Sequence, residues 1–378
     1  MTRRLFPALL SALCLFAAPC ALASSQPAAT SAPPATAARE GAFPIYMSGN
    51  RALAMIRIGA MPIPVVFDTG TTSNALDREF VEAIRLRQLG ASSVLDGWTG
   101  TSFPAVSVSL AGATINGLAL GDATADAYEY AGEDAAGLIG PNLFLGSLVY
   151  LELGWNRVRL RDKRVSDAPA GPGTPYLGPQ DDSLPAVDIE LPGGVTARAI
   201  MDSGATHPLS LPLAMADRLP LEASPRVTGR AMSVSGESPV YGARLRGTVR
   251  IGPVTLVNPD IRFVGRETVV GLRILRQLIV VLDPEARRSW VLAPCTPAST
   301  PMQDYVGRYE QRTVRIENGG LIYQREGRDP LQLRCLGEDL FESPAVGDLI
   351  QFRRREGRIT GFDIVGRDNR VSAVPRVE

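Results

Sequence analysis

The chain has 378 residues with 39 basic and 39 acidic side chains, so its formal net charge is zero. A neutral chain with no basic run is a poor nucleic-acid binder, and we expect no nucleic-acid partner. A single histidine, His207, excludes metal sites that need two histidines. The 37 glycines and 30 prolines favour turn-rich β structure, and the length predicts two to three domains.

The N-terminus has the pattern of a secretory signal peptide. Arg3 and Arg4 precede an apolar stretch from Leu5 to Ala18, and Ala21-Leu22-Ala23 is a small-x-small cleavage site. The alternative is an uncleaved anchor helix, but the apolar stretch is shorter than the roughly 20 residues that a membrane span needs. We therefore expect an exported chain, periplasmic or secreted, with no stable membrane span after cleavage.

Cleavage at this site would remove two of the four cysteines, and Cys295 and Cys335 would remain. In an oxidising compartment these two are expected to form a disulfide. The alternative is two unpaired cysteines.

The middle of the chain contains a repeat. One apolar run leads into Asp68-Thr69-Gly70, and a second leads into Asp202-Ser203-Gly204. An apolar-apolar-Gly triplet follows each motif at a nearly equal spacing, ending at Gly140 in the first copy and at Gly271 in the second. A short helix-like piece and an apolar strand follow each of these glycines. We interpret this order as a tandem duplication at low identity.

Alternating apolar and polar residues predict half-buried strands, for example over 106–110 and 245–251. One helix is expected after each Asp motif. Asp77 is a suitable N-cap for a first helix that ends near Gly90, and Pro212 is a suitable first residue of the second. These patterns predict an all-β fold with few helices.

Composition breaks divide the chain into segments. Proline- and glycine-rich stretches interrupt it after residue 165 and after residue 294. We predict a signal peptide at 1–23, a disordered leader at 24–40, an N-terminal lobe at 41–165, a linker at 166–180, a C-terminal lobe at 181–294 and a small β domain at 295–378.

The paired motifs resemble those of the retropepsin and pepsin-like aspartic proteases. Over about 41–294 the arrangement is similar to a bacterial exported retropepsin-like protease with two tandem lobes in one chain. The resemblance implies an aspartic endopeptidase in which Asp68 and Asp202, one from each lobe, form the catalytic pair. One ionised carboxylate takes a proton from water while the protonated partner donates to the scissile carbonyl oxygen. A polypeptide substrate is implied, and no cofactor or metal is expected.

The resemblance also implies roles for the neighbours of the two aspartates. The hydroxyl residues would cross-brace the two loops, and the glycines would allow tight turns and close packing. The residue after each motif differs, with Thr71 in one copy and Ala205 in the other, so we expect unequal hydrogen bonding of the two carboxylates. The expected loop-support residues are Thr69, Gly70, Thr71, Ser203, Gly204, Gly140 and Gly271.

A flap is expected between each Asp motif and its downstream glycine. Gly97, Trp98 and Gly100 form one candidate hairpin tip, and Gly236 belongs to the other. Trp98 is either an apolar lid over the substrate or a tryptophan packed at the surface beside a turn.

Several alternatives remain open. A lone Asp-Thr-Gly is commonly an ordinary turn, and the fold can persist after proteolysis is lost. The rival function is a non-catalytic periplasmic peptide-binding or scaffold protein. Lobes can also pair between chains, although a monomer with intrachain pairing is favoured here. His207 is close to Asp202 in sequence, and we favour a packing role over a role as catalytic base.

The C-terminal segment reads as small antiparallel β structure. Asn318-Gly319 and Glu356-Gly357 each lie between two apolar strands, which is a hairpin signal. Arg353 to Arg355 are interpreted as a solvated strand face, with a docking surface as the alternative.

Overall fold

The computed structural model describes residues 40–377, apart from 97–99, 131–133, 180–181, 234–235, 294–300, 338, 344–345 and 367–369. The predicted signal peptide, most of the predicted leader and Cys295 therefore lie outside the described residues. No helix in the described part of the chain is long and apolar enough to cross a membrane.

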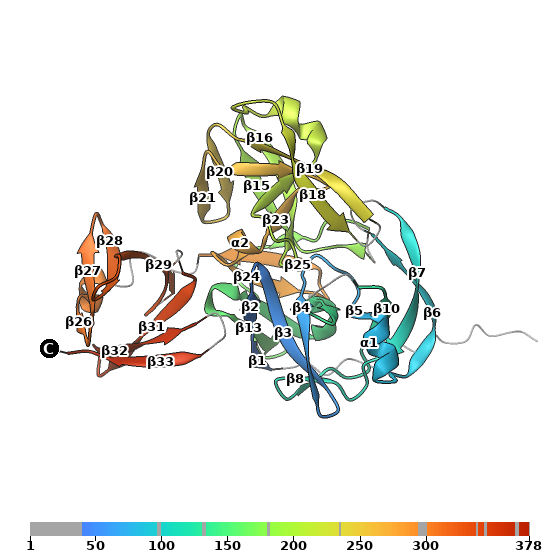
Figure 1. The fold of residues 1–378 in the computed structure, drawn as a ribbon, viewed down its shortest axis with the longest axis horizontal. Coiled ribbons are helices and arrows are strands. Elements are labelled where there is room, and N and C mark those ends of the chain that lie inside the picture. Colours follow the sequence, from blue (N-terminus) through green and yellow to red (C-terminus); the bar gives the residue numbers. More distant parts are fainter. Residues whose placement is uncertain are drawn as a thin grey trace, which may run out of the picture. The chain divides into compact units, whose positions relative to one another are not determined.

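The prediction of an all-β fold is confirmed, since four sheets account for most of the described chain (Figure 1). The helical elements are few and short. They are α1 (Arg78–Ala83), η1 (Pro141–Phe144), η2 (Leu153–Trp155), η4 (Leu213–Arg218), α2 (Leu272–Leu275) and η5 (Met302–Tyr305). Asp77 caps α1 as expected, but the helix ends at Ala83 and not near Gly90, because residues 88–95 form a strand instead.

The sheet of the first lobe has ten strands. In spatial order, its main path is β6 (Gln88–Leu95), β7 (Ser102–Ser109), β10 (Thr124–Tyr128), β5 (Ala75–Asp77), β11 (Gly137–Ile139), β4 (Met61–Phe67), β3 (Arg51–Ile58), β8 (Thr114–Ile115) and β9 (Leu118–Ala119), and β2 (Tyr46–Ser48) pairs with β3.

The sheet of the second lobe has nine strands. Their spatial order is β18 (Arg226–Ser233), β19 (Gly236–Arg244), β22 (Asp260–Phe263), β17 (Leu209–Leu211), β23 (Val269–Gly271), β16 (Val195–Asp202), β15 (Ala186–Leu191), β20 (Thr248–Ile251) and β21 (Val254–Val257).

The two lobe sheets have the same order of strands, position by position. In both, the strand that leads into the Asp motif runs parallel to the strand of the downstream glycine: β4 beside β11 and β16 beside β23. A second parallel pair also recurs, β10 with β5 and β22 with β17. This correspondence agrees with the tandem duplication inferred from the motifs.

A third sheet takes strands from both halves of the chain. Val149 to Leu151 pair with Val280 to Leu282, so a strand that follows Gly140 lies beside the equivalent strand that follows Gly271. The arrangement is symmetric about this central pair. The order is β1 (Gly41–Pro44), β13 (Arg157–Asp162), β12 (Ser147–Glu152), β24 (Ile279–Asp283), β25 (Arg288–Leu292) and β14 (Thr174–Pro175).

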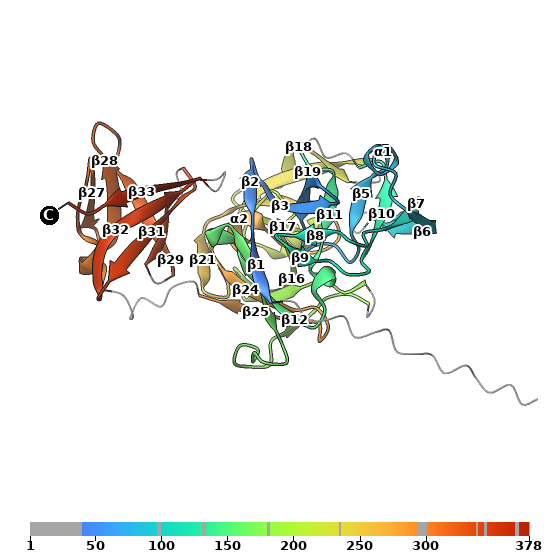
Figure 2. The ribbon, with the colours of Figure 1, turned by 90° about the horizontal axis from the view of Figure 1, so that it is seen from below.

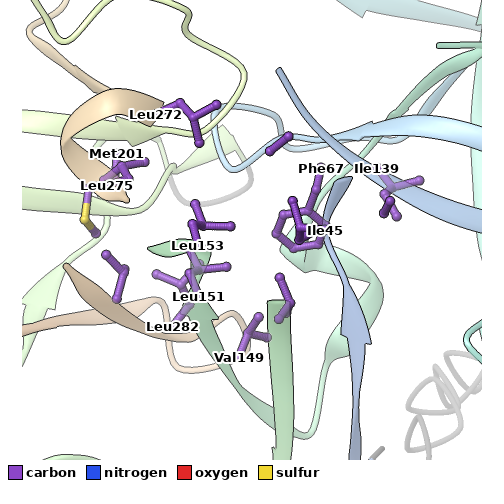
Figure 3. Packing of buried hydrophobic residues seen from close by; sticks show 14 of the residues in the cluster. Ile45, Phe67, Ile139, Val149, Leu151, Leu153, Met201, Leu272, Leu275 and Leu282 are labelled. Atoms are coloured by element: carbon purple, nitrogen blue, oxygen red, sulfur yellow. The ribbon is translucent and has the colours of Figure 1, made fainter. Parts of the chain in front are cut away.

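One hydrophobic core runs through both lobes and the shared sheet. Phe67 and Met201, the residues before the two aspartates, are fully buried and belong to the same cluster as Leu151 and Leu282 of the shared sheet. Figure 3 shows these side chains together in the packed interior. Burial of this apolar surface fixes the ends of the strands that carry the two Asp motifs.

The C-terminal residues form a separate eight-stranded antiparallel sheet (Figure 2). A backbone hydrogen bond from Val377 to Arg308, 2.8 Å long, joins the chain end to the first strand and closes the sheet toward a barrel. Both predicted hairpins are present, with Asn318-Gly319 and Glu356-Gly357 at positive φ. The strands are β26 (Gly307–Tyr309), β27 (Arg312–Glu317), β28 (Gly320–Arg325), β29 (Leu331–Gly337), β30 (Leu340–Ser343), β31 (Asp348–Arg355), β32 (Arg358–Val365) and β33 (Val371–Pro375).

Candidate active site

The two Asp motifs lie at the ends of equivalent strands. The Asp68 N–H donates to the carbonyl of Ile139 at 2.9 Å, and Asp202 is in register with Gly271 on the neighbouring parallel strand. Because each motif strand and its parallel neighbour end at the same register, each loop is held at the ends of two paired strands. The side chains of the two motifs then determine the contacts between the loops.

The two loops are joined by four reciprocal hydrogen bonds. The Thr69 hydroxyl donates to the carbonyl of Met201 at 2.5 Å and accepts from the Ser203 N–H at 3.0 Å. The Ser203 hydroxyl donates to the carbonyl of Phe67 at 2.6 Å and accepts from the Thr69 N–H at 3.0 Å. Both hydroxyl side chains are fully buried. The structure thus brings together the two residues that were expected to cross-brace the loops.

Each glycine of the motifs lies against the carboxyl group of the opposite lobe. A Cβ atom at Gly70 would stand 2.5 Å from Cγ of Asp202, and one at Gly204 would stand 2.7 Å from Oδ2 of Asp68. Real Cβ atoms do not approach other atoms so closely. The missing side chains are therefore what allow the two aspartates to face one another.

The two carboxyl groups have different surroundings. Asp68 accepts from the Gly70 N–H at 2.7 Å, whereas Asp202 accepts from the N–H groups of Gly204 and Ala205 at 2.8 and 2.9 Å. Burial raises the pKa of Asp202 well above its usual range, and the adjacent charge of Asp68 raises it further. Burial raises the pKa of Asp68 too, but hydrogen bonds from Gly70, from the Asp202 carboxyl and from Gly204 oppose the rise. The pKa of both carboxyl groups is thus raised, and that of Asp202 is raised further than that of Asp68.

The downstream glycines pack against the loops. The Gly140 N–H donates to the Asn74 side chain at 3.0 Å, and the Asn74 amide donates to the carbonyl of Thr124 at 3.0 Å. In the second lobe the Gly271 N–H donates to the carbonyl of Pro208 at 2.9 Å. Sequence reasoning overlooked Asn74, and its only signal was a polar residue shortly after the first Asp motif.

His207 packs beside the second loop. Its side chain is buried and its Nε2 lies 2.9 Å from the hydroxyl of Ser210. Burial and, to a smaller extent, the positive charge of Arg262 together lower the pKa of His207 to about 4. A neutral imidazole in this position agrees with the packing role.

Both expected flap regions are hairpins, β6 with β7 and β18 with β19. Gly97 and Trp98 lie outside the described residues, so neither interpretation of Trp98 is resolved. Gly100 is described, at φ 75°, and its N–H donates to the Asp96 carbonyl at 2.8 Å. Gly236 is the first residue of β19.

The remaining predicted residues are placed as follows. The Thr71 hydroxyl donates to the carbonyl of Ser73 at 2.7 Å, so it supports the first loop locally. Cys335 is disulfide-bonded, while its expected partner Cys295 lies outside the described residues. In the part of the chain that the structure describes, no group of three His, Cys, Asp or Glu side chains could hold a metal ion.

Comparison with known proteins gives two findings. Residues 187–272, which include the second Asp motif and its downstream glycine, match a family model described as aspartyl protease. The chain is also similar to a crystal structure of an aspartic proteinase from Irpex lacteus, with a TM-score of 0.40 and 12% identity over 68% of this chain and 97% of that one. No curated protein matches the chain.

Proposed function

We propose that this chain is an exported aspartic endopeptidase in which Asp68 and Asp202 activate a water molecule for attack on a peptide bond. The aspartyl protease match over 187–272 supports a peptidase function. The observation that carries the proposal is the pair of Asp motifs, joined by reciprocal hydrogen bonds, with each glycine against the opposite carboxyl group.

The surroundings of the two carboxyl groups support a division of roles. Asp202, whose pKa is raised well above its usual range by burial and by its neighbour's charge, would hold the shared proton and donate it to the scissile carbonyl oxygen. Asp68, whose ionised form receives hydrogen bonds from Gly70 and Gly204, would take the proton from water. The water oxygen forms a bond to the carbonyl carbon. The C–N bond then breaks as the amine nitrogen takes the proton that Asp68 removed from water, and Asp202 recovers its proton from the hydroxyl formed on the former carbonyl oxygen.

The proposal of export has its own support. The positive and apolar N-terminal pattern is that of a signal peptide. The disulfide at Cys335 is typical of proteins outside the reducing cytosol.

Cleavage of an unstructured protein between pH 3 and pH 8 tests the function. We expect Asp68→Asn and Asp202→Asn each to lower the rate by about 10²- to 10⁴-fold, because each removes one half of the general acid-base pair. Asp188→Asn, at an exposed aspartate of the second lobe, is the matched control and should cleave at the wild-type rate. Unchanged cleavage in both active-site variants would contradict the mechanism, and tight peptide binding without cleavage would favour the scaffold function.

A further inference from the structure

The second lobe contains a groove of about 690 Å³ that the proposed chemistry does not use. It is built from β18, β19, β22, α2 and the segment that follows the Asp202 loop. The groove lies close to the proposed active site. Pro208 is part of its lining, and the Pro208 carbonyl accepts a hydrogen bond from the Gly271 N–H at 2.9 Å.

Arginines dominate the lining of this groove. Two carboxylates, Glu222 and Asp260, also line it. The five arginines outnumber these carboxylates and leave the lining with an excess of three positive charges. The arginines are Arg226, Arg230, Arg244, Arg262 and Arg273.

Two of the arginines flank a glycine in one row across three strands. Arg226 on β18 is in register with Gly242 on β19, which is in register with Arg262 on β22. Neighbouring strands lie about 4.8 Å apart, so the two arginine backbones are separated by about 10 Å. Both side chains are exposed, and the glycine between them adds no side chain to the floor.

Three of the arginines form no ion pair within the part of the chain that the structure describes. Arg244 lies 3.6 Å from Glu222, and Arg230 forms an ion pair with Glu237. No ion pair to a described carboxylate is found for the other three, which are Arg226, Arg262 and Arg273. The charge of Arg262 also reaches buried His207 and helps to lower its pKa. Unbalanced like charges in one groove repel one another, and a bound anion would relieve that repulsion.

The first lobe shows that the fold does not require these arginines. At the equivalent row the residues are Gly90 on β6, Ser107 on β7 and Asp126 on β10. Asp126 therefore stands where the second lobe has Arg262, and it accepts a hydrogen bond from Ser92 at 2.8 Å. Two sheets with the same strand order thus carry opposite charge at the same position, so the positive charge at this position is a feature of the second lobe and not of the shared strand order.

We propose that the arginine groove binds an extended acidic stretch of the polypeptide substrate, an inference that rests on the proposed function. A guanidinium binds a carboxylate through two parallel N–H groups, and separate arginines suit acidic side chains spaced along a chain. Among the described strands β18 is the last at its end of the sheet, so one edge of its backbone has no described strand beside it and can pair with an extended peptide. The chain as a whole has zero net charge and no basic run, which disfavours a nucleic acid and leaves an acidic polypeptide as the ligand.

The test is a direct binding titration. The full chain carrying Asp202→Asn, which prevents cleavage, is titrated into a fluorescent peptide rich in glutamate and aspartate, and binding is followed by anisotropy. We expect saturable binding that weakens as salt is added, and about tenfold weaker binding after Arg226→Ala with Arg262→Ala. The same peptide with glutamine and asparagine in place of its acids should bind at least as weakly.

Matched controls separate the groove from general charge effects. Arg246→Ala with Arg250→Ala removes two exposed arginines of the same lobe that do not line the groove, and it should leave binding unchanged. Circular dichroism would verify that every variant is folded. Equal affinity for the acidic and the neutral peptide would overturn the inference. An equal loss of acidic-peptide affinity in the groove double variant and in the control double variant would overturn it too. Tighter binding of a single-stranded oligonucleotide, lost in the same groove variant, would also overturn it.

The peptide-binding test and the cleavage test can fail independently of one another. Acidic-peptide binding that depends on Arg226 and Arg262 would stand even if the wild-type chain cleaved nothing, and only the peptidase proposal would then fail. Cleavage of neutral and acidic substrates at equal rates, with no binding dependence on the groove, would retain the peptidase and reject the groove.

Discussion

Asp68 and Asp202 have the same position in their lobes but differ in the hydrogen bonds that they accept. Two backbone N–H groups of its own loop donate to Asp202, and still its pKa is raised well above the usual range, because burial and the charge of Asp68 outweigh those bonds. Close like charges cannot both ionise without a large cost, so the pair titrates as a unit. The asymmetry was expected from Thr71 and Ala205, although the structure places the Thr71 hydroxyl on Ser73 and not on a carboxylate.

The raised pKa of Asp202 makes stability depend on pH. A carboxyl group whose pKa is higher in the folded chain binds protons more tightly when the chain is folded. Its stabilising contribution to the free energy of unfolding is therefore complete below the pKa of the unfolded chain. That contribution is lost as the pH rises through the pKa of the folded chain. We expect Asp202→Asn to increase the free energy of unfolding at pH 7, by about 1.4 kcal/mol for each unit of the removed pKa rise, and to change it little at pH 3.

Urea unfolding of the wild type and the variant at pH 3, 5 and 7 measures this effect. Asp188→Asn, at an exposed site, provides the control for the loss of a negative charge. A variant that is less stable than the wild type at pH 7 would show that the buried carboxylate is stabilised in its ionised form.

At the scale of elements, the two loops act as one unit. Thr69 and Ser203 each donate to a backbone carbonyl and accept from a backbone N–H of the other loop. Removal of either hydroxyl leaves buried backbone groups without partners, which costs about 1–3 kcal/mol. The loops therefore contribute to lobe association as well as to the placement of the carboxylates.

A double-mutant cycle on Thr69→Val and Ser203→Ala tests this coupling. We expect each change to destabilise the chain by about 1–3 kcal/mol and the pair to be non-additive by about 0.5–3 kcal/mol, measured by urea unfolding. Thr255→Val on an exposed strand position is the control and should be nearly neutral. Additive effects of the two changes would show that the loops behave independently.

Local sequence predicted the features that depend on neighbouring residues. The Asp motifs, the N-cap at Asp77 and the hairpins at Asn318-Gly319 and Glu356-Gly357 are each encoded within a few positions, and all are found where expected. The helix that begins at Arg78 was predicted to be too long, because the tendency of residues 88–95 to form a strand prevails over a weak helical pattern.

Features that depend on distant pairing could not be predicted. The pairing of Val149 to Leu151 with Val280 to Leu282 joins segments from different lobes of the chain, and no local pattern specifies such a partner. The arginine row also depends on distant pairing. Arg226 and Arg262 lie in one row only because both are in register with Gly242 of β19. Their charges were visible in the sequence, but their proximity was not.

At the scale of the whole molecule, a buried acid links the C-terminal sheet to the second lobe. Glu342 on β30 is almost fully buried, forms an ion pair with Arg334 of its own sheet and lies 3.0 Å from Arg276, which follows α2. Removing one member of a buried ion pair leaves the remaining charge without compensation, which costs more than an exposed pair contributes.

We expect Glu342→Gln to destabilise the chain by about 1–3 kcal/mol, since two arginines lose their shared partner while Arg334 stays partly exposed to water. Differential scanning calorimetry measures the change and shows whether the C-terminal sheet then unfolds separately. Glu317→Gln, at an exposed pair with Arg315, is the matched control and should have little effect. An equal effect of the two substitutions would contradict a structural role for the buried acid.

The central pairing of β12 with β24 makes the shared sheet symmetric, while both strands belong to a single chain. If the two lobes were two copies of one chain, every substitution would appear in both of them. Equivalent positions could then not hold Asp126 in one lobe and Arg262 in the other. A single gene that encodes both halves frees each half to mutate alone. The two lobes therefore keep Asp68 and Asp202 in common, where both lobes must act together. Their outer strands are free to diverge, so that one lobe can acquire a ligand preference that the other lacks.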